Sequence, residues 1–399
     1  MKTIGLLSSL LVVLAFATLS ITTPVLAKAP YSTTDVLLTG LSNAGILDVD
    51  NRALVYFAES FNWRTLPDSF GNPVPLADVV VKYFDPAKKV TTTLFEVPDS
   101  VFSGPFVVDR PGNTWNAFYF ISVPRVAYDE NGNPYVSEVS YEVRKFDGVQ
   151  MTLASTVSGW SNGFHFANSM ALDVWGNLYY KMTAASTTTI YKVAAGSTSP
   201  EALLVLQEGQ LGGAMSIASG VLYFVAGVPD LQVVRLYKYD LGKGILTTFL
   251  ERSSVVSGAG FNAGTLAYLS ANLQGDVYYL YRQRGPYWDD RQWGVIELGR
   301  ASSGKTPKIL LNERTDFNVW AFVPSSNQMQ ASMAGDVFFH LASFHPLLGA
   351  EDYYVYWYNP RTGSYSSVLH DSFGFTIQID GSDNLYFVDS QGTLARLNA

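Results

Sequence analysis

The sequence contains no cysteine, and this absence removes whole classes of chemistry. Disulfide bonds cannot stabilise the fold, and cysteine nucleophiles, zinc–thiolate sites and iron–sulfur clusters are excluded. Charged residues are scarce, at 15% of the chain, and there are only four histidines. No Asn-x-Ser/Thr sequon is present, so N-glycosylation has no acceptor. A chain that is 48% hydrophobic can nevertheless bury a large core.

The charge balance is acidic, with a formal net charge of −8 and no basic run of any length. Nucleic acid and anionic membrane surfaces attract clusters of Lys and Arg, so neither is an expected partner. No local spacing of His, Asp and Glu provides three converging ligands, so we predict no metal site and no cofactor.

The first 27 residues differ from the rest. Lys2 supplies a basic start, an apolar run covers 6–19, and Val-Leu-Ala at 25–27 fits a small-residue cleavage site. This pattern predicts a secretory signal peptide that is cut near Ala27, because the apolar run is short for a membrane anchor. No later stretch is long enough to span a bilayer. We therefore expect one extracytoplasmic domain over residues 28–399.

The dominant pattern is a repeated turn followed by an aromatic strand, as in Asp-Val-Trp-Gly-Asn-Leu-Tyr-Tyr from Asp173 to Tyr180. Seven copies are found, with turn centres near Arg52, Gly132, Gly176, Gly220, Gly275, Gly335 and Asp383. The first spacing is 80 residues and the others are 44 to 60, which suits four-stranded propeller blades with insertions. An acid recurs in some copies and is missing from others, so Asp173 is predicted to build a turn rather than to catalyse.

The flanking residues favour four strands per copy: a small-residue inner strand, the aromatic strand, a strand ending in a hairpin, and a Thr-rich or apolar outer strand. The last copy ends after its third strand. Residues 32–40 resemble the outer strand at 90–97, so we predict that they pair into the last blade and close the ring. The sequence thus predicts an all-β, seven-bladed β-propeller. Six blades or a pair of β-sandwiches remain alternatives.

The Asp-x-x-Gly-Asn turn and the strand that follows it resemble the repeat of NHL, SMP-30 and YncE-type β-propellers. The resemblance covers residues 32–399 and implies the propeller fold. That superfamily includes lactonases, lyases, binding scaffolds and assembly platforms, so it implies no single function. The metal ligands of the SMP-30 lactonases and the paired histidines of the streptogramin lyases match no positions here, and those activities are not carried over.

Most of the excess length is expected in loops on one face, conventionally the top. These loops include 61–77, 98–116, 282–294 and 313–328, and they carry aromatic and charged residues. Such side chains suit a sugar or a protein surface, although they could instead pack the loops together. The candidate ligand-binding residues are Trp63, Arg64, Trp288, Asp289, Asp290, Trp293 and Trp320.

Catalytic patterns are weaker. Gly-Trp-Ser-Asn-Gly at 159–163 has the form of a nucleophile elbow, but no helix is predicted after it. If an enzyme site exists, we expect His165 and His345 as acid and base, Tyr287 as proton donor and Arg291 as carboxylate clamp. The leading hypothesis is a secreted binding module for a carbohydrate or protein ligand. The alternative is an extracellular carbohydrate-active or lactone-cleaving enzyme, with its site at the channel mouth.

Overall fold

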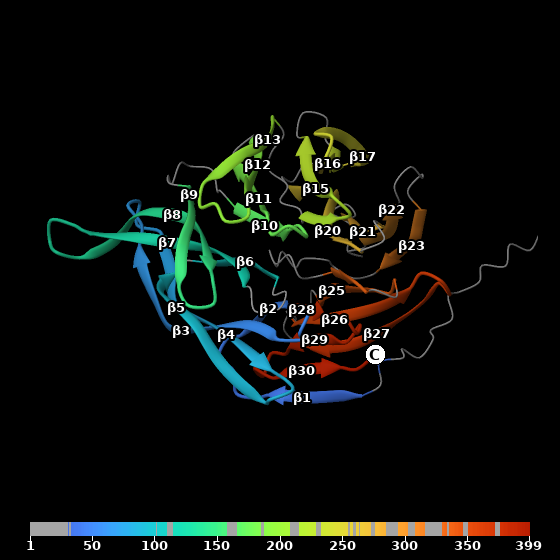
Figure 1. Cartoon of the computed structure of the whole chain (residues 1–399), viewed down its shortest axis with the longest axis horizontal. Coiled ribbons are helices and arrows are strands. Elements are labelled where there is room, and N and C mark those ends of the chain that lie inside the picture. Colours follow the sequence, from blue (N-terminus) through green and yellow to red (C-terminus); the bar gives the residue numbers. More distant parts are fainter. Residues whose placement is uncertain are drawn as a thin grey trace, which may run out of the picture.

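The computed structural model is an all-β ring of seven four-stranded antiparallel sheets, the blades of a β-propeller (Figure 1). The structure describes residues 31, 33–100, 102–109, 115–157, 166–184, 187–207, 215–228, 233–253, 256–257, 261–262, 264–272, 276–284, 294–301, 308–315, 329–332, 335–345, 350–371 and 376–399. In these ranges no helix has the length and hydropathy needed to cross a membrane.

Blades 1 to 6 are each built from four strands that follow one another in the chain, from the innermost strand to the outermost. Blade 1 contains β2 (Gly45–Val49), β3 (Val55–Pro67), β4 (Pro73–Asp85) and β5 (Val90–Ser100). Blade 2 contains β6 (Phe102–Asp109), β7 (Asn116–Tyr128), β8 (Pro134–Phe146) and β9 (Met151–Val157). Blade 3 contains β10 (Phe166–Leu172), β11 (Leu178–Ala184), β12 (Thr187–Val193) and β13 (Pro200–Leu206).

The other half of the ring repeats this order. Blade 4 contains β14 (Met215–Ala218), β15 (Val221–Val228), β16 (Val233–Asp240) and β17 (Ile245–Ser253), and a short pair follows, β18 (Val256–Ser257) and β19 (Phe261–Asn262). Blade 5 contains β20 (Gly264–Ala271), β21 (Val277–Arg284), β22 (Gly294–Ala301) and β23 (Lys308–Thr315). Blade 6 contains β24 (Met329–Ala331), β25 (Val337–His345), β26 (Ala350–Asn359) and β27 (Ser364–Asp371).

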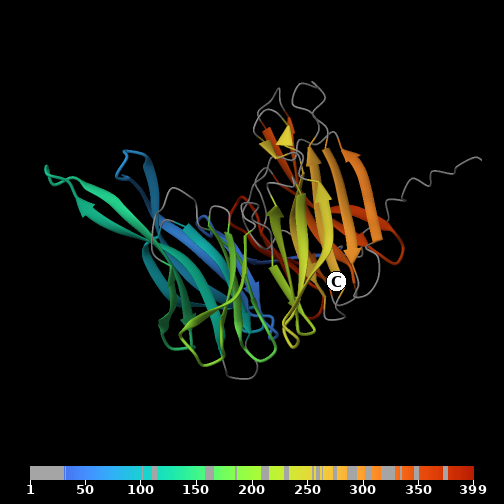
Figure 2. The same cartoon turned by 90° about the horizontal axis from the view of Figure 1, so that it is seen from above.

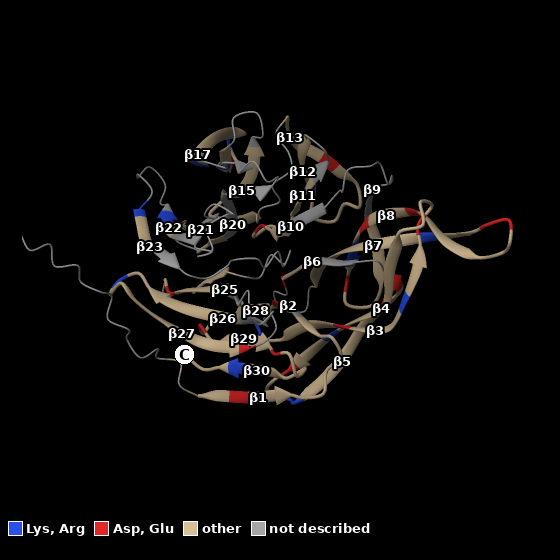
Figure 3. Cartoon of the chain, turned by 180° about the vertical axis from the view of Figure 1, so that it is seen from behind, with Lys and Arg blue, Asp and Glu red and all other residues tan. Residues whose placement is uncertain are grey.

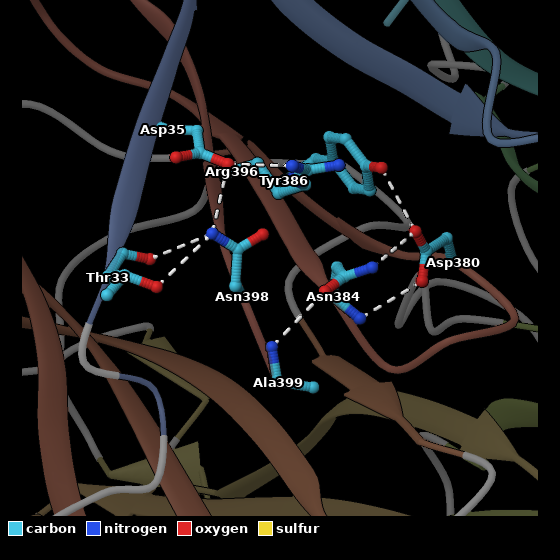
Figure 4. Close-up of polar contacts among 8 residues, drawn as sticks. All are labelled: Thr33, Asp35, Asp380, Asn384, Tyr386, Arg396, Asn398 and Ala399. Carbon is cyan, nitrogen blue, oxygen red and sulfur yellow. Dashed lines mark hydrogen bonds and ion pairs between the residues drawn. The ribbon is translucent and has the colours of Figure 1, made fainter. Parts of the chain in front are cut away.

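Blade 7 joins the two ends of the described chain, as the sequence predicts. It contains β28 (Thr376–Ile379), β29 (Leu385–Val388), β30 (Leu394–Leu397) and, as its outer strand, β1 (Thr34–Leu38). Figure 4 shows the polar contacts of this closure, including the ion pair between Arg396 and Asp35, 2.7 Å apart. The seven-blade prediction and the prediction of an N-terminal closing strand are therefore confirmed.

The turns between inner and second strands show what the repeated acid does. Asp173 Oδ1 accepts the N–H groups of Trp175 and Asn177, at 2.9 Å each, while Oδ2 accepts from the Asn177 amide at 2.8 Å and from the Tyr179 hydroxyl at 3.1 Å. Gly176 has a φ of 81°, a backbone conformation that favours glycine. The carboxylate therefore organises the turn and anchors the following strand, which confirms the architectural interpretation of Asp173.

Neighbouring blades are held together by large apolar side chains on the second strands. These strands place alternate residues against the blade before and the blade after, so each interface is a separate core. Between blades 2 and 3, for example, Phe118 and Phe120 pack against Leu178 and Tyr180. The aromatic run that follows each turn thus supplies large side chains to the cores between blades.

A β-bulge recurs in all seven blades at the pairing of the third strand with the outer strand. In every blade the extra residue is apolar and packs into an inter-blade core. These residues are Leu37, Leu94, Ala154, Leu203, Phe249, Leu310 and Val368. A bulge twists an exposed edge and turns one more side chain inward, which explains the paired apolar residues of the outer strands, such as Leu37–Leu38.

The structure corrects one part of the repeat assignment. The turn at Asp129 joins the second and third strands of blade 2, whereas the inner and second strands of that blade, β6 and β7, are separated by 110–115. The expected top-face loop at 98–116 therefore contains the inner strand β6. The same Asp-x-x-Gly-Asn residues form a turn wherever two antiparallel strands meet, so the motif alone does not say which pair of strands it joins.

Candidate interaction surface

Two β-hairpins extend beyond the body of the ring and form what we call the hairpin pair, residues 62–78 and 123–139. They are the continuations of β3 and β4 in blade 1 and of β7 and β8 in blade 2, all four strands being 13 residues long. Figure 2 shows both hairpins projecting away from the blades. Six residues of extended strand reach about 20 Å, so the tips lie well clear of the ring. The expected loop at 61–77 is therefore a regular hairpin.

Each hairpin ends in the same turn that organises the blades. Asp68 accepts the N–H groups of Phe70 and Asn72 at 2.8 and 2.7 Å, and the Asn72 amide donates to it at 2.9 Å. Asp129 makes the corresponding bonds to Asn131 and Asn133. Hydrogen bonds from Asn72 lower the pKa of Asp68 below its usual value. Both tips are consequently defined turns rather than open loops.

The two hairpins have a small core of their own. Val74 and Leu76 of the first hairpin pack against Val136 and Val139 of the second, and all four side chains are buried. A parallel bridge between Asp68 and Val136 adds a backbone link near the tip. Two-stranded hairpins are marginal alone, so this shared core is what allows the pair to stand as one unit.

A polar cluster fixes the base of the first hairpin. The Asp78 carboxylate accepts from the Asn62 amide at 2.7 Å and from the Asp99 N–H at 3.0 Å, and Arg64 forms an ion pair with Asp99. Asn62 and Asp99 both have positive φ values, 51° and 55°. These bonds lower the pKa of Asp78. Left-handed non-glycine residues persist only where surrounding contacts hold them, so the geometry at this base is fixed.

The cluster has a consequence for Trp63. The register of β3 against β4 shifts between Phe61 and Arg64, and Trp63 lies inside this bulge with 58% of its surface exposed. A β-bulge changes the direction of a side chain, so that it no longer follows the alternation between the two faces of the strand. The Trp63 side chain is therefore largely exposed to solvent.

The tips add two further exposed aromatic side chains, Phe70 at 77% and Tyr128 at 70%. Elsewhere in the described ranges, Trp175 is the other aromatic residue with a comparably exposed surface, at 67%. It occupies the third position of its turn, as Phe70 does, but in a turn between inner and second strands. Acidic residues mark the outermost turn of the second hairpin in Figure 3, from Asp129 and Glu130. The hairpin pair thus combines aromatic and acidic groups.

Prolines are concentrated on the same strands, at positions 67, 73, 75, 124 and 134. Proline has no N–H, so it cannot donate to an added strand, and it is a common protection of exposed sheet edges. Pro73 and Pro75 lie on the stretch of β4 beyond Ser100, where β5 ends its pairing. This stretch of β4 therefore has fewer N–H donors to offer to an added strand.

Ionisable groups inside the ring have structural partners. Asp48 accepts the N–H groups of Val49 and Val108 at 2.8 and 2.9 Å, which links the inner strands of blades 1 and 2, and burial raises its pKa to about 7. It lies two residues before the Asp50 turn, on the face opposite to the hairpin tips. Within the described ranges, no group of three or more His, Asp or Glu residues is placed to hold a metal.

Two buried basic side chains lie on the second strands of blades 3 and 6. Lys181 is fully buried and donates to the Val225 carbonyl of the next blade at 3.0 Å, and burial lowers its pKa to about 7. His340 is buried on β25 and stacks on Tyr353, with ring centroids 5.5 Å apart.

Of the residues predicted from sequence, Trp63 and Arg64 lie in the described part, as consecutive residues at the base of the first hairpin. His345 is the last residue of β25, and its role as an acid or base stays a prediction. The remaining candidates lie outside the described residues and stay predictions: His165, Tyr287, Trp288, Asp289, Asp290, Arg291, Trp293 and Trp320.

Sequence reasoning missed Phe70 and Tyr128 as surface groups. The signals were present: Asp-x-x-Gly-Asn occurs at 68–72 and at 109–113 as well as at the expected places, and the first repeat spacing is too long by part of a blade. The copy at 109–113 falls between the inner and second strands of blade 2, so the copies at 68–72 and 129–133 are the additional turns, and each ends a strand extension.

Comparisons with known proteins identify the fold. No family model matches the chain, and no curated protein sequence matches it. An oligogalacturonate lyase in complex with manganese has a TM-score of 0.52 at 9% identity, over 86% of this chain and 97% of that one. An oligogalacturonate lyase from Vibrio parahaemolyticus has a TM-score of 0.49 at 9% identity, covering 92% and 98% of the two chains. The β-propeller domain of the Trilobed protease from Pyrococcus furiosus has a TM-score of 0.43 at 9% identity, covering 73% and 78%. At such identities the likeness is one of fold alone.

Proposed function

We propose that this protein is an interaction module that binds a protein partner through the hairpin pair. One observation carries the proposal: two hairpins leave the ring, are joined by a small apolar core between their own strands, and hold three aromatic side chains largely exposed to solvent. Exposed aromatic residues on a rigid support are typical anchors of protein interfaces. The segment 1–27 supports an extracytoplasmic location, and the turn pattern supports a relationship to NHL, SMP-30 and YncE-type propellers.

The shape favours a protein over a small ligand. Small-molecule and sugar sites are mostly concave, whereas the hairpin pair is a projection whose aromatic groups are spread from base to tip, with Trp63 seven residues before Phe70. A projection of this kind needs a partner that supplies the groove. The prolines on its strands argue against strand addition, so the aromatic and acidic side chains supply recognition.

Site-specific photo-crosslinking tests this proposal. Benzoylphenylalanine replaces Phe70 in one variant and Trp175 in another, and each purified chain is irradiated with extract and medium of the producing cells. We expect a discrete protein adduct from position 70 and none from position 175, because both side chains are exposed in the same type of turn but only one lies on the hairpin pair. Equal adducts from both positions would contradict the proposal.

A glycan array, run in parallel, distinguishes a carbohydrate ligand from a protein partner. If the wild-type chain binds a defined glycan and Trp63→Ala abolishes that binding, the ligand is a carbohydrate and the protein-partner proposal is wrong. Trp175→Ala is the matched control, because it removes an exposed indole from the other face.

A further inference from the structure

The outer strand of blade 7 differs from the other six. β1 has five residues and four paired positions against β30, whereas the other outer strands have 7 to 11 residues. Those strands follow their neighbours directly through a hairpin, but β1 comes from the opposite end of the described chain. No covalent turn therefore holds β1 beside β30.

The side-chain contacts of β1 are mostly at the surface (Figure 4). Asp35 accepts from Arg396 at 2.7 Å and from the Asn398 amide at 3.0 Å, and Asn398 also donates to the Thr33 hydroxyl at 3.2 Å. Exposed ion pairs of this kind add little free energy. Leu37 and Leu38 are the residues of β1 that reach the core, and both are half-buried.

The segment after β1 can act as a hinge. Gly40 and Asn43, between β1 and β2, both have positive φ values, 73° and 43°. Strand release would leave the strand pairing of blades 1 to 6 and of the inner three strands of blade 7 unchanged, but it would withdraw Tyr31 from the core between blades 6 and 7. In an exchanged blade the Tyr31 of the second copy would take that place. Exchange of a terminal strand through such a connection is a known low-energy route to assemblies.

The exposed edge would not accept every strand. An incoming strand must supply two consecutive apolar residues at the bulge of blade 7, as Leu37 and Leu38 do. It must also carry an acid two residues before this pair, as Asp35 is, to form the ion pair with Arg396. A second copy of this chain carries that combination by definition.

We propose that β1 is an exchangeable strand, and that the edge of β30 is a binding site for the β1 segment of a second copy. The exchanged blade has the same contacts as the closed one, so exchange is limited by competition with the chain's own β1. A tethered strand has an effective concentration in the millimolar range, so exchange is favoured where copies are concentrated.

The absence of native cysteine allows a direct test. One chain carries Asp35→Cys and a second, differently tagged chain carries Arg396→Cys, since these residues are register partners. The two purified chains are mixed at high concentration, diluted and oxidised. The matched control uses Lys192→Cys and Glu201→Cys, which are also an ion-paired cross-strand pair of third and outer strands, but in the continuous blade 3. Double variants in one chain show that each bond can form.

We expect both double variants to form an internal disulfide. The mixture of Asp35→Cys and Arg396→Cys chains should give much more covalent heterodimer than the mixture of Lys192→Cys and Glu201→Cys chains. The amount of heterodimer should increase with the protein concentration at which the two chains are mixed before dilution. Equal amounts of heterodimer in the two mixtures would overturn the proposal. Failure of the Asp35→Cys/Arg396→Cys double variant to close, while the blade 3 variant closes, would overturn the pairing on which it rests.

Discussion

Lys181 gives the sharpest test of how the blades pack. The ammonium group is fully buried between blades 3 and 4, and burial lowers its pKa to about 7, from an ordinary value near 10.5. Above pH 7 the unfolded chain therefore binds more protons than the folded one, so stability rises with pH from about 7 toward 10. One proton corresponds to about 1.4 kcal/mol per pH unit. Below pH 7 the buried ammonium group is charged, and its burial lowers the free energy of unfolding by the full amount, on the order of 5 kcal/mol.

Lys181→Met retains an unbranched apolar side chain and removes the free-energy cost of burying the ammonium group. It also removes the donor to the Val225 carbonyl, which costs about 1 to 3 kcal/mol. We expect the variant to be more stable than wild type at pH 7, and its advantage to shrink by about 2 kcal/mol at pH 9. Urea unfolding followed by tryptophan fluorescence at both pH values measures this. Lys192→Met, at a partly exposed position that pairs with Glu201, is the control. An advantage of Lys181→Met that does not change with pH would refute the argument.

Two further predictions concern the turns and the hairpin pair. Asp173→Ala should lower the unfolding free energy by about 3 kcal/mol and Asp129→Ala by clearly less, because Asp173 is buried and also accepts from the Tyr179 hydroxyl, whereas the bonds of Asp129 are exposed to water; denaturant unfolding of both variants measures the difference. Leu76→Ala should increase amide hydrogen exchange in residues 62–78 and 123–139 while the blades stay protected, because Leu76 packs in the core that the hairpins share. Loss of protection throughout the ring would show that the hairpins are not a separate unit.

Repetition explains why the fold was predictable. A turn-and-strand pattern that recurs along the chain averages out local ambiguity, and the resemblance of residues 32–40 to 90–97 was enough to predict the closing strand. The bulge in the outer strands was not foreseen, although Leu37–Leu38 and Leu94–Phe95 carry its signature. Paired apolar residues in a strand suggest burial on both faces, and only the register in the sheet shows that one of them is extra.

The hairpin pair could not be derived in the same way. The residues Asp68 to Asn72 and Asp129 to Asn133 have the blade-turn pattern, and nothing local says whether such a turn lies beside the channel or at a projecting tip. That distinction depends on long-range packing of Val74 and Leu76 against Val136, which periodicity within one hairpin does not report. The exposure of Phe70 follows from the same packing.

The most direct test of the binding surface is a competition experiment with the position-70 photo-crosslink. Excess unmodified chain is added before irradiation in three forms: wild type, the Phe70→Ser/Tyr128→Ser double variant, and Trp175→Ser. All substitutions are at exposed positions, so the ring should fold in each. If the hairpin pair is the binding surface, wild type and Trp175→Ser will suppress the adduct and the double variant will not. Equal suppression by all three chains would contradict it.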